Sequence, residues 1–298
     1  MRRVNKKGIA WAAAFVSSIV LLCVFVAYLY LPSLVLYYYI LTHFSLYKYS
    51  FYIGLPIRVL HILLCCIPLF FLLRKLLGLR KMEKPNPQLL KSIFRQYFIL
   101  TLIVAIIVFS LEASLAVALF SPVERDIGSF MDSASSARGG DVDCVVKEVT
   151  RYIDARLGWS WNNPMSSLEI DNMLSFIDYW FLGMLGYTQT HVVLWQGWGS
   201  CGEHAVVTAY LLDRLGYTVR VAHFNDIDHT WAEVHVNDSW YIVDPWYIGN
   251  IYEKQYQGNK YLVPVDILAS LKDFSGNHRV LCRYLNGTET DCSSEHGY

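Results

Sequence analysis

The sequence predicts an α+β domain, in which a cysteine-bearing helix packs on an antiparallel sheet, preceded by an α-helical transmembrane region. Of the 298 residues, 54% are hydrophobic and only 17% are charged, which is more apolar than an ordinary soluble domain. Most of the apolar excess lies in residues 1–120. The remainder shows a long helical pattern followed by short alternating patterns typical of strands. The formal net charge of zero gives no argument for a nucleic-acid partner.

Three apolar stretches, 9–30, 51–73 and 97–120, are each long enough to cross a bilayer, which takes roughly 20 residues. Lys and Arg precede the first stretch and are frequent between the second and third, whereas Lys48 is alone between the first and second. This distribution predicts a multi-pass protein of the cell membrane with an extracytoplasmic C-terminal domain. Another apolar stretch, 31–45, is interpreted as interfacial; as a fourth span it would invert that orientation.

Two ionisable residues fall in these stretches, Glu112 in the third and Arg58 near the predicted outer end, which is the beginning, of the second. Ionisable groups in a membrane are costly and usually paired, so a hypothesis of membrane function would centre on them, although Glu112 could simply face another helix. No repeated or glycine-broken spans indicate a transporter. Small and polar residues predict a linker over 121–142, followed by the domain, 143–298.

Within the domain, apolar periodicity predicts helices over 143–157 and from about 165 to 185. The tryptophan-rich stretch 188–198 is interpreted as a loop. The next helix carries the conspicuous cysteine and is closed by Gly216, as helix C-termini often are. Short alternating patterns then predict mostly antiparallel strands, joined by turns such as Asn237-Asp238. The predicted ranges of the third helix and the strands are 201–215, 217–224, 229–236 and 239–244.

Three residues carry the predicted chemistry: Cys201, His229 and Asp244, spaced by 28 and 15 residues. A thiol is a good nucleophile only as thiolate, and the unpaired amides at a helix start favour that negative charge. A histidine acts as base and acid, and an aspartate holds its tautomer. His229 and Asp244 are each about seven residues from the Asn237 turn, so an antiparallel hairpin would bring them side by side.

An oxyanion hole beside Cys201 needs hydrogen-bond donors. The backbone N–H of Cys201 is one, and the second is a side chain just upstream, with Gln196 favoured over Trp195 or Trp198. Aromatic side chains cluster around these motifs. They either line a substrate groove or belong to the core: Trp195, Trp198, Trp231 and Trp246.

The cysteines Cys282 and Cys292 flank an Asn286-Gly287 turn signal, so a hairpin would bring the two thiols together. We therefore predict a disulfide between them, as in an oxidising compartment outside the cell. A competing zinc site, Cys201 and His204 with His223 or His229, explains the pattern less well than a triad does, so no metal is predicted.

Four motifs together resemble the transglutaminase-like superfamily: Gly-Ser-Cys-Gly-Glu-His-Ala (199–205), Leu-Gly-Tyr-Thr-Val-Arg (215–220), His-Thr-Trp-Ala-Glu-Val (229–234) and Trp-Tyr-Ile-Val-Asp-Pro (240–245). The resemblance covers about 199–246. It implies a papain-like α+β core and a Cys201–His229–Asp244 triad that acts on amide bonds through an acyl-thioester. Family members include cross-linking transferases, peptidases, amidases and inactive binding modules.

Together these observations predict a membrane-anchored, cysteine-dependent hydrolase or acyltransferase, either a peptidase or amidase or a protein-glutamine acyltransferase. Its expected partners are a protein or peptide substrate and the lipid bilayer, and it needs no cofactor. The alternative is a catalytically inactive binding or scaffold module on the same fold. Neither the substrate nor the oligomeric state can be predicted from these residues.

Overall fold

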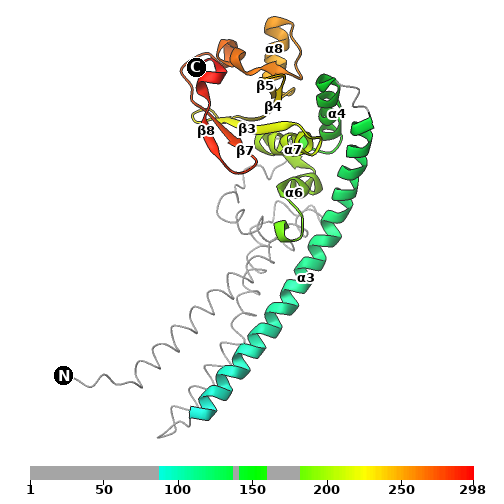
Figure 1. The fold of residues 1–298 in the computed structure, drawn as a ribbon, viewed down its shortest axis with the longest axis vertical. Coiled ribbons are helices and arrows are strands. Elements are labelled where there is room, and N and C mark those ends of the chain that lie inside the picture. Colours follow the sequence, from blue (N-terminus) through cyan, green and yellow to red (C-terminus); the bar gives the residue numbers. More distant parts are fainter. Residues whose placement is uncertain (1–86, 137–140, 160–181) are drawn as a thin grey trace, which may run out of the picture. The chain divides into compact units, whose positions relative to one another are not determined.

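A computed structural model of the chain describes residues 87–136, 141–159 and 182–298 (Figure 1). Internal contacts divide the chain into two compact units. The second unit, Leu119–Asp171 with Gly186–Tyr298, contains all of the predicted catalytic residues. It is described here by itself.

The centre of this unit is a six-stranded, fully antiparallel sheet with the order β6-β5-β4-β3-β7-β8. β4 and β5 are joined by Asn237 and Asp238, whose φ angles are 48° and 62°. A tight two-residue hairpin requires this left-handed conformation at both positions, and Asn and Asp tolerate it well. The strands are β3 (Thr218–Phe224), β4 (Thr230–Val236), β5 (Ser239–Val243), β6 (Val263–Pro264), β7 (Val280–Tyr284) and β8 (Glu289–Asp291).

Helices cover one face of the sheet. α7 (Cys201–Arg214) packs on β3 and β4, and α4 (Val142–Asp154) and α6 (Gln189–Gln196) pack on α7 (Figure 1). Their shared core includes Val207 and Leu211 of α7 with Ala232 and Val234 of β4, all 0% exposed. Burial of this face fixes the register of the sheet, because a one-residue slip would turn these side chains away from α7.

The opposite face of the sheet carries a second apolar core. Trp231 of β4 and Ile242 of β5 pack there with Phe274. Adjacent residues of β4 thus alternate between the two cores, as the twofold period of a strand requires. The covering segments are α8 (Ile248–Tyr256) and the 3-10 turns η3 (Val265–Ser270), η4 (Lys272–Phe274) and η5 (Ser293–His296).

A short parallel pair of strands, β1 (Gly158–Trp159) and β2 (Trp198–Gly199), lies beside the N-terminus of α7. Gly158 pairs with Trp198, and Trp159 pairs with Gly199. Because Gly199 is two residues before Cys201, this pair brings Trp159 close to the start of α7. The aromatic surroundings of the cysteine thus come from segments far apart in the sequence.

The α+β prediction is confirmed, but one element of it is wrong. The stretch 188–198, expected as a loop, contains α6, which begins with a capping box between Thr188 and His191. His191 Nδ1 lies 3.0 Å from the Thr188 backbone N–H, the place usually taken by Glu or Gln. The predicted helix from 165 to 185 lies mostly outside the described residues.

The predicted transmembrane region must be corrected. In the described part of the chain, no helix combines the length and the apolar composition that crossing a bilayer requires. The third predicted span, 97–120, is part of α3 (Pro87–Ser136), a helix of 50 residues that does not stop at residue 120. Composition alone therefore misjudged where this element ends. The stretches 9–30, 31–45 and 51–73, with Arg58, lie outside the described residues, and the Glu112 side chain is likewise not described.

The second half of α3 is bound to the globular unit. The Asp126 carboxylate accepts hydrogen bonds from Tyr152 and Arg156, and Glu124 contacts His191 at 2.7 Å. Ile127 is fully buried in the core with α4 and α7. The segment expected as a linker, 121–142, is therefore helical as far as Ser136.

Candidate active site

Cys201 is the first residue of α7, and the local sequence determines that position. Ser200 is the N-cap residue, and its backbone N–H donates to Glu203 Oε2 at 2.7 Å in a capping box. Gly199 is required just before it, since a Cβ atom there would lie 2.5 Å from Glu203 Cβ. The Cys201 thiol is free and partly exposed, beside the unpaired amides of the first helical turn. A negative charge on sulfur is favoured at this position.

His229 precedes β4 directly and contacts both other members of the predicted triad. Its Nε2 lies 2.8 Å from Asp244 Oδ2, and the Cys201 thiol is near enough to the imidazole to raise its pKa. Since Asp244 occupies Nε2, Nδ1 is the nitrogen that faces the thiol. Only 8% of His229 is exposed, and Tyr247 packs edge-on against its ring at 4.9 Å. The structure thus brings the three residues together in the order that nucleophilic catalysis requires.

Asp244 follows β5 and is fixed by the start of the next helix. Its carboxylate accepts hydrogen bonds from the backbone N–H groups of Tyr247 and Ile248, at 3.2 and 3.0 Å. Gly249 lets the backbone at Lys260 approach this turn, because a Cβ atom there would lie 2.1 Å from the Lys260 carbonyl oxygen and 2.9 Å from that of Asp244. Two backbone donors and an imidazole therefore hold a carboxylate that is only 4% exposed.

The electrostatics of His229 favour its charged form. Burial alone lowers the pKa of His229, but the hydrogen bonds with Asp244 and Cys201, and their negative charges, outweigh it and raise the pKa to about 9. At neutral pH the imidazole therefore carries a proton. An imidazolium next to a thiol favours the thiolate, which is the nucleophilic form.

The oxyanion candidates occupy different positions. The Gln196 amide donates one of its two N–H groups to the Trp198 carbonyl oxygen at 2.8 Å, which holds the side chain against β2. The Trp198 indole N–H is buried and, among the described residues, has no acceptor. Trp198 is thus the upstream side chain whose single donor is buried and unpaired among the described residues, so it is favoured for an oxyanion over Gln196.

The remaining predicted groove residues separate into two groups. Trp246 is partly exposed and lies near the start of α7, where its indole N–H donates to Asp154 at 2.7 Å. Trp231, by contrast, is 1% exposed and lies behind His229, with ring centroids 5.9 Å apart. Trp195 packs edge-on against Phe120 of α3. Of these three, Trp246 combines partial exposure with a contact to His204 near the start of α7.

Sequence reasoning weighed His204 only as a zinc ligand and missed Trp159, and both lie beside the start of α7. Their rings stack with centroids 3.9 Å apart and an interplanar angle of 9°, and Trp246 meets His204 edge-on at 5.0 Å. His204 is 2% exposed although it is polar. The only sequence signal was its position three residues after Cys201, on the same side of a helix.

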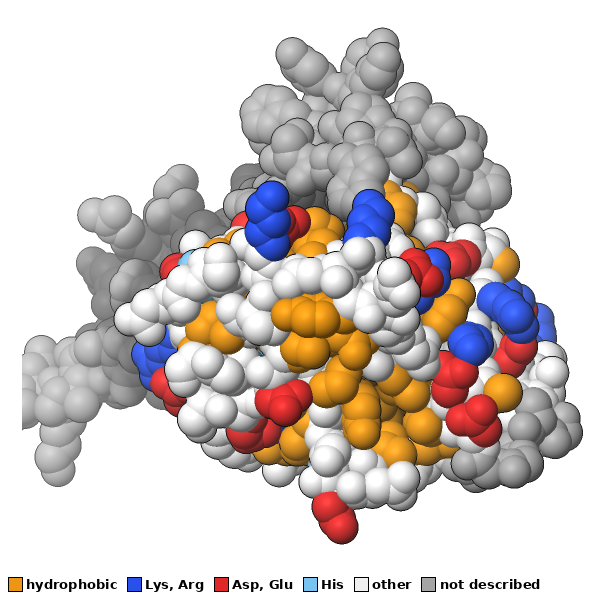
Figure 2. Space-filling model, turned by 90° about the horizontal axis from the view of Figure 1, so that it is seen from above, with side chains coloured by type: hydrophobic (Ala, Val, Ile, Leu, Met, Phe, Trp, Pro, Cys, Tyr) orange, Lys and Arg blue, Asp and Glu red, His pale blue; other side chains and the backbone are white. Residues whose placement is uncertain are grey.

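Apolar side chains also reach the surface next to the triad. Figure 2 looks onto the end of the domain where α8 lies and shows hydrophobic side chains gathered between acidic and basic ones. Tyr247, which contacts His229, is 45% exposed, and Tyr256 of α8 is 44% exposed. An apolar rim therefore adjoins the imidazole.

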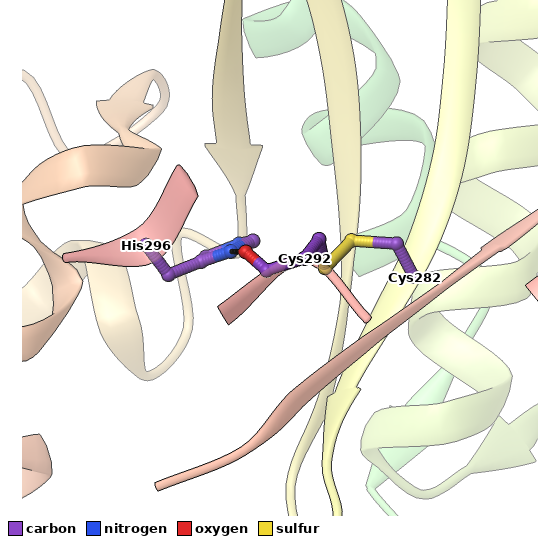
Figure 3. Close-up of side chains that lie close together, drawn as sticks. All are labelled: Cys282, Cys292 and His296. Atoms are coloured by element: carbon purple, nitrogen blue, oxygen red, sulfur yellow. Dashed lines mark hydrogen bonds between the residues drawn. A yellow bond between two sulfur atoms is a disulfide. The ribbon is translucent and has the colours of Figure 1, made fainter. Parts of the chain in front are cut away.

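Cys282 and Cys292 form a disulfide that joins β7 to the residue after β8, and His296 follows in η5 (Figure 3). His296 Nε2 lies 2.6 Å from Glu233 Oε1, and its Nδ1 lies 2.9 Å from the Cys292 carbonyl oxygen. The two sulfurs and His296 are close enough for a metal site. However, the sulfurs are bonded to each other and both imidazole nitrogens have partners, so this arrangement offers no thiolate ligands.

The Glu233 carboxylate is the centre of a buried network behind His229. Besides His296, it accepts hydrogen bonds from Arg220 Nε at 2.6 Å and from the Trp231 indole at 2.7 Å. Arg220, Glu233 and His296 are each 0% exposed. Burial raises the pKa of Glu233, but His296 and Arg220 outweigh this effect and keep it low. The network fixes the Trp231 ring against His229.

No model of a known protein family, no curated protein and no solved structure matches this chain significantly. The resemblance to the transglutaminase-like superfamily therefore stays a prediction that depends on the four motifs and on the geometry of Cys201, His229 and Asp244.

Proposed function

We propose that this protein is a thiol enzyme that acts on amide bonds through an acyl-thioester on Cys201. The observation that carries the proposal is the contact chain from the Cys201 thiol through His229 to Asp244, with the thiol at a helix start. Such an arrangement serves nucleophilic acyl transfer on several unrelated folds. It also agrees with the transglutaminase-like motifs.

The reaction has two steps, acylation of Cys201 and hydrolysis of the thioester. The Cys201 thiolate attacks the carbonyl carbon, forming a C–S bond, and the C–N bond breaks as the His229 imidazolium donates its Nδ1 proton to the departing amine. Neutral His229 then takes a proton from water, whose oxygen attacks the thioester. The C–S bond breaks, the carboxylic acid leaves, and the thiolate and imidazolium are restored. Asp244 orients the imidazole and stabilises its charge in both steps.

Hydrolysis is favoured over transfer to a second amine, because water is the default acceptor and no amine site is evident among the described residues. The Cys201 backbone N–H and the Trp198 indole would stabilise the oxyanion. The substrate class is a protein or peptide amide, for which the apolar rim at Tyr247 offers contact area.

The test is to trap the acyl-enzyme in the full-length protein with p-nitrophenyl acetate. Mass spectrometry should find one acetyl group on Cys201 after a burst of nitrophenol, and none there in Cys201→Ala or His229→Ala. Cys144→Ser is the matched control, since Cys144 is the other free, exposed thiol in the described residues. It should leave the burst unchanged.

A folded protein without a burst, in which Cys201 acylates no faster than Cys144, would refute this function. That result would favour the alternative, a transglutaminase-like binding or scaffold module that keeps the fold without catalysis. Adding glycine ethyl ester to the acylated enzyme separates hydrolysis from transfer, because only a transferase would yield the N-acetyl product.

A further inference from the structure

Two buried side-chain polar atoms in the described residues have no hydrogen-bond partner, and both adjoin Cys201. They are Trp198 Nε1, three residues before the cysteine, and His204 Nε2, three residues after it. Buried polar atoms are nearly always hydrogen-bonded, so an exception indicates a group that binds something else. Trp198 is accounted for by the proposed oxyanion, but His204 is not.

The protonation of His204 follows from its other nitrogen. Nδ1 lies 2.8 Å from the Ser200 carbonyl oxygen. A carbonyl can only accept, so Nδ1 carries the hydrogen. Burial lowers the pKa of His204 below its usual value, so the ring is neutral at physiological pH. Nε2 therefore presents a lone pair, and its missing partner must be a hydrogen-bond donor.

Among the described residues, none donates a hydrogen bond to His204 Nε2. Trp159 stacks on one face of the ring and Trp246 meets it edge-on. The Trp246 indole N–H is already donated to Asp154. The charged groups that act on His204 are the carboxylates of Glu203, Asp154 and Asp244, which accept hydrogen bonds rather than donate them.

The position of His204 connects this lone pair with the reacting centre. His204 is one helical turn from Cys201 on the same side of α7, so the two side chains are neighbours. Trp246, which covers His204, is two residues after Asp244 of the triad. The covering rings of Trp159 and Trp246 are both partly exposed. These two rings also contact each other, with centroids 5.9 Å apart, so a planar polar group would reach Nε2 by displacing one of them.

We propose that His204, Trp159 and Trp246 form a subsite for a carboxamide, in which His204 Nε2 accepts a hydrogen bond from the amide N–H of the substrate. This inference rests on the proposed function and deepens it, because it explains how the site would distinguish amides from esters. The Trp198 donor and the His204 acceptor complement the C=O and the N–H of one amide group. An ester group has no hydrogen-bond donor, so it would leave Nε2 without a partner.

The test compares two small neutral alkylating reagents on the full-length protein. Iodoacetamide carries amide N–H groups, and methyl iodoacetate carries none. For each reagent the rate at Cys201 is divided by the rate at Cys144, which cancels intrinsic reactivity. The amide-to-ester ratio should fall about fivefold in His204→Phe, which keeps a stacking ring but loses one neutral hydrogen bond. His204→Gln, whose side-chain oxygen also accepts, should restore part of the ratio.

A ratio that is the same in the wild type and in His204→Phe would overturn the subsite. Since His204→Phe could fold poorly, the wild-type protein gives a second measurement. Its ¹⁵N resonance of His204 Nε2 should shift on titration with acetamide and not with methyl acetate. An unmoved resonance means that acetamide does not reach Nε2, and equal shifts with both mean that Nε2 does not select an amide; either result refutes the inference. This titration needs no reactive thiol, so a failure of the proposed catalysis would be recognised separately.

Discussion

Replacing Glu233 with Gln tests whether the buried network behind His229 supports the domain. Glu233 accepts hydrogen bonds from Arg220, Trp231 and His296, and its side chain is 0% exposed. The substitution keeps the shape but removes the negative charge. Arg220 would then rely on Glu295, whose side chain is 43% exposed, as its charged partner.

The expected loss of stability in Glu233→Gln follows from the burial of Glu233 and Arg220. Removing one partner of a buried ion pair costs about 3–5 kcal/mol, because the other charge is left uncompensated. In a domain of this size each kcal/mol lowers Tm by about 2–4 °C, so we expect a drop of about 6–20 °C.

Thermal unfolding of the full-length chain, followed by near-UV circular dichroism of the tryptophans, measures this change. The matched control is Glu289→Gln, which removes an ion pair with Arg283 at the surface of the same sheet. Exposed pairs contribute about 0–1 kcal/mol, so the control should unfold close to the wild type. If Glu233→Gln unfolds at the temperature of the control, the reasoning about this network is wrong.

Three further predictions concern stability and the site. The pKa of His229 is raised from 6.5 to about 9, so protonated His229 stabilises the folded state fully below pH 6.5, and this contribution is lost as the pH rises through 9. Denaturant titrations should show that the free energy of unfolding falls by up to about 3 kcal/mol over this range, and by less in Asp244→Asn. Replacing Cys282 and Cys292 by Ala opens a loop of sequence separation 10, which should cost roughly 3 kcal/mol in thermal unfolding. Gly249→Ala places a Cβ atom 2.1 Å from the Lys260 carbonyl oxygen and 2.9 Å from that of Asp244, so it should cost about 3 kcal/mol and slow alkylation of Cys201.

Each of these three predictions has its own control. A pH dependence that persists unchanged in Asp244→Asn would remove His229 as its source. Reducing the wild-type disulfide with a phosphine should reproduce the double alanine variant; a stable reduced protein would argue against the loop-closure estimate. Gly128→Ala, where a Cβ atom meets nothing within 4 Å, is the control for Gly249→Ala and should be neutral or stabilising.

The triad geometry could be predicted because its determinants are local. A capping Ser and Glu set Cys201 at a helix start, and a two-residue turn at Asn237 sets the hairpin that carries His229 and Asp244. The apolar alternation of β4 fixes which face is buried. The Cys282–Cys292 hairpin is local in the same sense.

The surroundings of the site could not be predicted in this way. In the capping box of α6, His191 stands where Glu or Gln is usual, and β1 and β2 are two-residue strands with no periodic pattern. Trp159 reaches His204 only through this pairing. That His204 is buried with one free lone pair depends on contacts between segments far apart in the sequence.

The membrane prediction used composition without context. Apolar residues over 97–120 matched the length of a span, yet in the structure they belong to the longer helix α3, whose later residues enter the domain core. The hydrophobic signal gave no position for the end of this helix. Ile127, for example, packs with α4 and α7.

The most direct test of the central claim is the pH dependence of iodoacetamide labelling at Cys201 in the full-length protein. Cys144 is the comparator in the same molecule, since Asp141 beside it raises its pKa. The account predicts fast labelling of Cys201 that persists well below pH 8 and is lost in His229→Ala. Labelling that rises only near pH 8.5, the pKa of a free thiol being about that value, and that is unaffected by His229→Ala would contradict it.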